Sequence, residues 1–110
     1  MKLPRGDDAI VPLRKLTEYL LSESHPVGSS KAGFFHSLGF DNDNVRWLEN
    51  GLLNIARHGD IVADVSSSHG IKYVIDGQIE SPRGGVVVLR TVWIIETDQG
   101  QPRFVTAYPK

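Results

Sequence analysis

Residues 86–95 read VVVLRTVWII, and this apolar run decides the fold that the sequence predicts. Apolar residues occupy both alternate sets of positions, whereas a strand with one solvated face alternates apolar and polar residues. The run therefore predicts a central strand that is covered on both faces, or covered on one face and part of a cleft on the other. Arg90 interrupts the run, and a charged side chain there requires a carboxylate, an anionic ligand or solvent at a cleft.

Further strands are predicted on both sides of this run. Residues 61–65, 71–79 and 103–108 are rich in β-branched and aromatic residues, and the central strand extends to residue 97. Short turn segments separate the strands, so neighbouring strands run antiparallel in a four-stranded meander. If the last hairpin pairs Arg90 with Tyr108, a one-residue slip would move these side chains to opposite faces.

The first half of the chain predicts helices at about residues 12–22, 30–38 and 43–58, where apolar residues recur at helical spacing. Gly39 follows the second helix at the position of a left-handed C-cap. Helices followed by strands predict an α+β fold, with two to three helices on one face of the sheet and a ligand cleft on the other. The expected core includes Phe34, Phe35, Leu38, Leu48, Leu52, Ile55 and Trp93.

Composition limits the classes of function. The chain has 110 residues, which predicts a single domain over residues 1–110, and its formal charge of −1 argues against a strongly basic nucleic-acid binder. The absence of Cys excludes disulfides, thiolate nucleophiles and Cys-ligated zinc. The four histidines lack metal-ligand spacing, so we expect no metal and no cofactor. Charges near the N-terminus, where a signal peptide is apolar, predict a cytoplasmic protein.

Three stretches could carry chemistry. Residues 28–31, Gly-Ser-Ser-Lys, enter a helix with unpaired backbone N–H groups and a cation, which predicts a phosphate site; a helix cap with a surface lysine is the alternative. Lys72 and Asp76 share one face of a strand, which is either functional or simply solvated. Arg90 binds an anion or forms a structural ion pair, for instance with Asp76.

Four motifs carry a family resemblance: HPVGSSKAGFFHSLGF at 25–40, GIKYVIDG at 70–77, LRTVWII at 89–95 and RFVTAYP at 103–109. Together they resemble a bacterial family catalogued as a domain of unknown function, whose members occur near toxin–antitoxin genes or as C-terminal modules of larger toxins. The ending VTAYP is also similar to endings in the barnase/EndoU/colicin/RelE-like ribonucleases. That second resemblance is an analogy at the level of the fold.

The resemblance implies a metal-independent endoribonuclease toxin that cleaves RNA through attack of the 2′-hydroxyl on the phosphate, together with a cognate antitoxin or immunity protein. A titrating base, a cation and an acid are the groups that this reaction needs. The catalytic residues implied are His25, Lys72, Arg90, Thr106 and Tyr108. The substrate-binding residues implied are Gly28, Ser29, Lys31 and Trp93.

Two other functions remain open. A non-catalytic antitoxin or immunity partner would explain the near-neutral charge, because a protein that binds a basic toxin need not be basic itself. An unrelated small binding module is the third possibility. Growth arrest on induced expression discriminates a toxin from an antitoxin.

Overall fold

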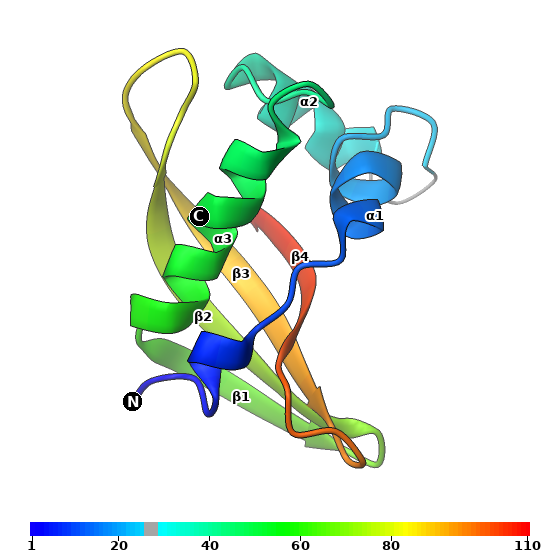
Figure 1. Cartoon of the computed structure of the whole chain (residues 1–110), viewed down its shortest axis with the longest axis vertical. Coiled ribbons are helices and arrows are strands. Elements are labelled where there is room, and N and C mark those ends of the chain that lie inside the picture. The colour runs from blue at the N-terminus through cyan, green and yellow to red at the C-terminus, as the bar shows by residue number, and fades with distance from the viewer. Residues whose placement is uncertain (26–28) are drawn as a thin grey trace.

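The computed structural model describes residues 1–25 and 29–110, so Gly28 of the predicted phosphate site lies outside the described residues, as do Pro26 and Val27 before it. The helical elements come first: a 3₁₀ turn η1 (Gly6–Asp8), α1 (Leu13–Lys15), a π-helical turn η2 (Leu16–Leu20), α2 (Ser29–Ser37) and α3 (Val45–His58). The strands follow: β1 (Ile61–Ser67), β2 (Gly70–Glu80), β3 (Val86–Glu96) and β4 (Arg103–Pro109). Figure 1 shows this order, and it confirms the predicted α+β class.

The strands form one antiparallel sheet in the order β1-β2-β3-β4, as the meander predicted. Arg90 lies opposite Tyr108 and Val92 opposite Thr106, so of the registers that the sequence left open the structure has the one that puts these side chains on one face. The next pair is Trp93 with Phe104, so β4 contains one extra residue at a bulge. The bulge lets Phe104 and Ala107, three residues apart, both face the core.

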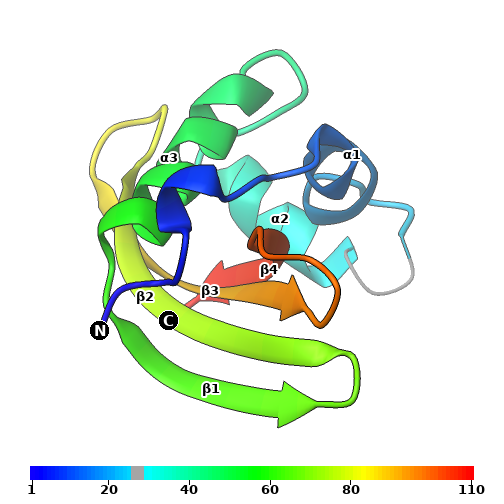
Figure 2. The same ribbon diagram turned by 60° about the horizontal axis from the view of Figure 1, so that its bottom comes forward.

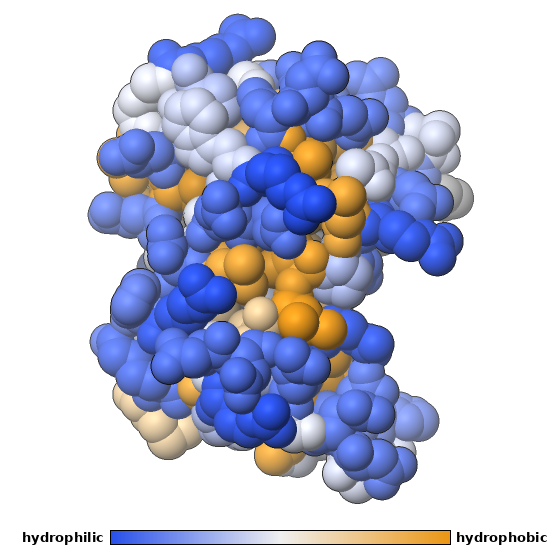
Figure 3. Space-filling view, viewed as in Figure 1, coloured by the Kyte–Doolittle hydropathy of each residue, from blue (hydrophilic) through white to orange (hydrophobic). Residues whose placement is uncertain are grey.

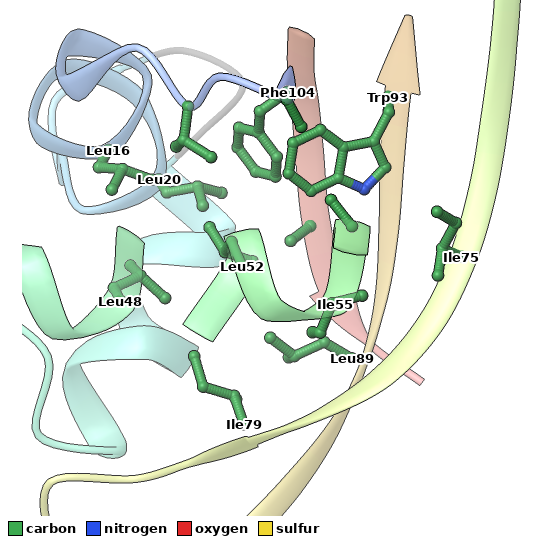
Figure 4. Packing of buried hydrophobic residues seen from close by; sticks show 14 of the residues in the cluster. Leu16, Leu20, Leu48, Leu52, Ile55, Ile75, Ile79, Leu89, Trp93 and Phe104 are labelled. Carbon is green, nitrogen blue, oxygen red and sulfur yellow. The ribbon is translucent and has the colours of Figure 1, made fainter. Parts of the chain in front are cut away.

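Helices cover only one face of the sheet in the described part of the chain (Figure 2). We call the opposite, helix-free face the outer face. The core lies beneath α3, where Leu48, Leu52 and Ile55 point toward the sheet and Trp93 packs edge-on against Phe104 with ring centroids 5.3 Å apart (Figure 4). Gly77 allows β2 to approach α3, because a Cβ there would overlap Ile55.

Most of the predicted core residues are buried in this cluster. Phe35, Leu48, Leu52, Ile55 and Trp93 are buried, whereas Phe34 and Leu38 are partly buried and pack against its surface. The C-terminus of α2 follows the prediction too: Gly39 has a φ of 98°, and the Phe40 N–H donates to the Phe35 carbonyl.

The first predicted helix differs from expectation. In place of one α-helix over residues 12–22, a single α-helical turn passes into η2, where the Leu21 N–H donates to the Leu16 carbonyl. Such an i→i+5 bond widens the turn. As a result Leu16, Leu20 and Leu21 are all buried, while Tyr19 lies half-buried beside β4.

The N-terminal segment before α1 also pairs with the sheet. Ile10 forms a parallel bridge with Arg103, and its carbonyl accepts the Phe104 N–H, so this segment lines the start of β4. An apolar strip crosses the helix-covered side of the molecule near the segment (Figure 3). Among the described residues, no helix has the length and apolar character that crossing a membrane requires.

Candidate functional site

A group of polar side chains gathers around Tyr19 at the β4 edge of the sheet. The Tyr19 hydroxyl is hydrogen-bonded to Thr106 Oγ1 at 3.0 Å, and the His25 ring meets the Tyr19 ring edge-on at 5.0 Å. The ammonium groups of Lys15 and Lys31 lie 4.7 and 5.5 Å from the Tyr19 ring centroid. We call these five residues the Tyr19 cluster. It joins α1, η2, α2 and β4 at one place.

The surroundings of Tyr19 alter its acidity. Partial burial raises the pKa of Tyr19, but the hydrogen bond with Thr106 and the positive charges of Lys31 and Lys15 lower it, and the net pKa lies below the usual value. Hydrogen bonds and cations act this way because they stabilise the phenolate more than the phenol. The cluster therefore combines a histidine, an acidified phenol and two cations around one point.

A groove of about 390 Å³ adjoins the cluster and shares Lys15 with it. Lys72 and Arg103 are the other cations of the groove, and Pro12, Ile94 and Val105 supply apolar surface. Arg103 is hydrogen-bonded to Glu96. The groove is thus an apolar depression with cations along it.

The register places three successive rows of side chains on the part of the outer face beside β4. Lys72, Ile94 and Arg103 pair across β2, β3 and β4 in the first row, which borders the groove. Val74, Val92 and Thr106 form the middle row, and Asp76, Arg90 and Tyr108 form the third. The Tyr19 cluster meets this face at Thr106, in the middle row.

Arg90 in the third row is held by a carboxylate. Its Nε and Nη2 donate to Asp76 Oδ1 and Oδ2 at 2.8 and 3.0 Å, and Lys110 Nζ lies 3.4 Å from the same carboxylate. The hydrogen bonds from Arg90 lower the pKa of Asp76, with a further contribution from Lys110. The structural ion pair that the sequence left open as an alternative for Arg90 is therefore confirmed.

Three other predicted site residues, Ser29, Tyr108 and Trp93, are not members of the Tyr19 cluster. Ser29 is exposed at the start of α2, where its N–H donates to the His25 carbonyl, and Tyr108 is exposed opposite Arg90. Trp93 is fully buried on the core face of β3, and its indole N–H donates to Thr91 Oγ1. Substrate cannot reach a side chain in that position, which corrects the assignment of Trp93 to substrate binding and confirms its assignment to the core.

Sequence reasoning missed Tyr19, Lys15 and Arg103. Lys15 and Tyr19 stand four residues apart, a spacing that places them on one side of a helix, and this was the available signal. The contact between Tyr19 and Thr106 spans 87 residues, and no local pattern predicts it. Within residues 1–25 and 29–110, no three His, Asp or Glu side chains gather to hold a metal ion.

Comparison with known proteins supports the family resemblance. By its fold, the chain is an α+β domain in which the helices precede the sheet. The chain belongs to the family described as Domain of unknown function (DUF6883), whose model matches residues 2–110. A chain in a solved structure titled "Contact-dependent growth inhibition toxin - immunity protein complex from Klebsiella pneumoniae 342" is similar in fold, with a TM-score of 0.73, 19% identity and 96% of each chain covered. None of the curated proteins compared with this chain matches it in sequence.

Proposed function

We propose that this chain is a metal-independent endoribonuclease of a bacterial toxin–immunity system, and that the Tyr19 cluster is where the RNA phosphate reacts. The observation that carries the proposal is the convergence of His25, Lys31 and Thr106 on Tyr19. The likeness in fold to a chain from a toxin–immunity complex supports the toxin–immunity setting of the proposal.

The cluster has the groups that cleavage requires. A base removes the proton of the 2′-hydroxyl, whose oxygen forms a bond to phosphorus while the bond to the 5′-oxygen breaks, and an acid protonates that leaving oxygen. The products are a 2′,3′-cyclic phosphate and a 5′-hydroxyl. His25 and Tyr19 form the acid–base pair, because both carry protons that can be exchanged and their rings touch.

Charge stabilisation falls to the cations of the cluster. Lys31 stabilises the negative charge that builds on the phosphorane, and Thr106 orients the Tyr19 hydroxyl. Lys72 contacts the RNA backbone beside the reacting phosphate. We leave Arg90 out of the reacting groups because its guanidinium is engaged by Asp76. We also leave out Tyr108, which lies opposite Arg90 in the third row. RNA as substrate places the activity in the cytoplasm.

For a toxin, the expected protein partner is a cognate immunity protein. The second candidate function is that this chain is itself the immunity protein. The formal charge of −1 favours a non-catalytic immunity protein, since a partner of a basic toxin needs no positive surface. Such a protein would bind a toxin and cleave nothing.

The test is digestion of labelled RNA by the purified chain, with and without EDTA. The proposal expects cleavage that EDTA leaves intact, products ending in 2′,3′-cyclic phosphate, and growth arrest when the chain is expressed in cells. His25→Ala should abolish the arrest, and Arg14→Gln, which removes an exposed charge paired with Glu18, is the matched control. Absence of both cleavage and arrest would support the immunity role.

A further inference from the structure

We propose that the groove beside the Tyr19 cluster binds the nucleotide next to the reacting phosphate, with its base on the apolar wall and its phosphate at Lys15 and Lys72. This rests on the proposed function, because it assigns a place to the second nucleotide of the same RNA substrate. The inference is carried by position, by chemistry and by charge.

The groove lies directly beside the Tyr19 cluster, because the two share a residue. Lys15 lines the groove and also lies 4.7 Å from the Tyr19 ring centroid, so the two sites are contiguous. On the sheet, the groove row of Lys72, Ile94 and Arg103 adjoins the row that contains Thr106. A strand of RNA that places one phosphate at Tyr19 therefore extends its next nucleotide into the groove.

The chemistry of the groove matches both parts of a nucleotide. Ile94, Val105 and Pro12 present apolar surface to a base, and bases bind between apolar or aromatic side chains in other nucleic-acid enzymes. Arg103 has a planar guanidinium, a group on which unstacked bases also stack, and its hydrogen bond to Glu96 orients it. Contacts of this kind tolerate every base, so the groove contributes affinity rather than sequence choice.

The charges of the groove also favour a phosphodiester. Within the described part of the chain, neither Lys15 nor Lys72 has a carboxylate partner, whereas Arg90 in the third row is paired with Asp76. An ammonium group without a carboxylate can neutralise a phosphate and release its counterions, which gives binding that weakens with salt. The groove gathers Lys15 and Lys72 at one place, so it offers local positive charge to RNA although the formal charge of the chain is −1.

The test uses a short 2′-O-methyl RNA, which cannot supply the attacking hydroxyl and so reports binding alone. Fluorescence anisotropy would measure its affinity over a range of salt concentrations. Lys72→Gln should lower the slope of log K against log salt by about 0.7, the value for one phosphate contact on a single strand. The matched control is Lys2→Gln, which removes the same charge at a lysine that is paired with Asp60 and does not line the groove.

A second variant tests the base contact. Ile94→Thr keeps a β-branched side chain but makes the wall polar, so it should weaken binding of the 2′-O-methyl RNA and leave binding of inorganic polyphosphate unchanged. Equal loss for both probes would overturn the base contact. Unchanged binding of the 2′-O-methyl RNA would also overturn it and would show that the groove recognises charge alone.

The outcomes separate this proposal from the proposed function. Lys72-dependent binding in a protein that cleaves no RNA would uphold the groove as a nucleotide site and refute the ribonuclease. Cleavage of RNA by a protein in which Lys72→Gln and Lys2→Gln bind alike would refute the groove and leave the ribonuclease standing. No binding of the 2′-O-methyl RNA at all would also overturn the groove as a nucleotide site.

Discussion

The first and third rows of the outer face carry similar basic residues but have different surroundings. In the third row, Arg90 and Lys110 both meet the carboxylate of Asp76, whose side chain is 16% exposed. In the first row, Lys72 borders an open groove, and Lys15 reaches it from the helical side. The comparison teaches that Arg90, which lies opposite a carboxylate on the neighbouring strand, forms a structural pair, whereas Lys72 lies opposite Ile94 and faces the groove. Arg103 of the first row is itself paired with Glu96, so Lys72 and Lys15 supply the positive charge of the groove.

The largest effect is expected at His25, in the Tyr19 cluster and outside the third row. His25→Ala should lower the rate of RNA cleavage by roughly 10²–10⁴-fold, the usual range for loss of one acid–base group. The rate is measured on a short labelled RNA, and circular dichroism checks that the variant is folded. A folded His25→Ala protein that cleaves at the wild-type rate would remove the Tyr19 cluster from the mechanism.

The core beneath the outer face supports both rows, and Thr91 is its buried polar residue on β3. The Thr91 hydroxyl donates to the Ile75 carbonyl at 2.7 Å and accepts from the Trp93 indole at 2.8 Å. Thr91→Val should destabilise the fold by about 1–3 kcal/mol, because it leaves a buried indole N–H without an acceptor. Denaturant unfolding measures this, and Thr91→Ser, which keeps the hydroxyl, should recover most of the loss.

Asp76 predicts how the third row responds to acid. Its pKa is lowered in the folded state, so its pairing with Arg90 stabilises the protein above the ordinary Asp pKa of about 3.9, and the stabilisation is lost as the pH falls through the lower folded pKa. The wild-type melting temperature should therefore decline in this acidic range. Asp76→Asn should melt lower at neutral pH and show a shallower acid decline; equal slopes for both proteins would contradict a structural pair.

The smallest expected effect is a shift in the titration of Tyr19. Lys31 and Lys15 lower its pKa, so Lys31→Gln should move its ionisation to higher pH. The chain has 3 tyrosines, and a difference titration against Tyr19→Phe isolates the signal by ultraviolet absorbance. An unchanged titration in Lys31→Gln would place the Lys31 ammonium too far from the phenol to act on it.

The sequence was sufficient for the order and direction of the strands, because the alternation of 71–79 and 103–108 and the short turns define a meander. It did not determine the register of the last hairpin, because a one-residue slip keeps the same strands and turns; the structure supplies the pairing of Arg90 with Tyr108. The π-helical turn was not predictable in this way. Its i→i+5 bond depends on how Leu16, Leu20 and Leu21 pack against the rest of the core.

The candidate site was predictable only in part, because its residues meet through contacts between segments that are far apart in the sequence. His25, Lys31 and Thr106 were each singled out from the sequence and meet in the structure. The residue that joins them, Tyr19, resembled one more apolar position of an amphipathic helix. Arg90 was selected because it interrupts an apolar run, but only the register shows that Asp76 lies directly opposite it.

The central claim is that RNA reacts at the Tyr19 cluster and not at the third row. The direct measurement compares single-turnover cleavage of one RNA by Lys31→Gln and Arg90→Gln, two folded variants that each lose one positive charge. The account predicts that Lys31→Gln slows cleavage by roughly 10²-fold or more, as for loss of a group that stabilises transition-state charge, and that Arg90→Gln keeps the wild-type rate. Slower cleavage by Arg90→Gln than by Lys31→Gln would contradict the account.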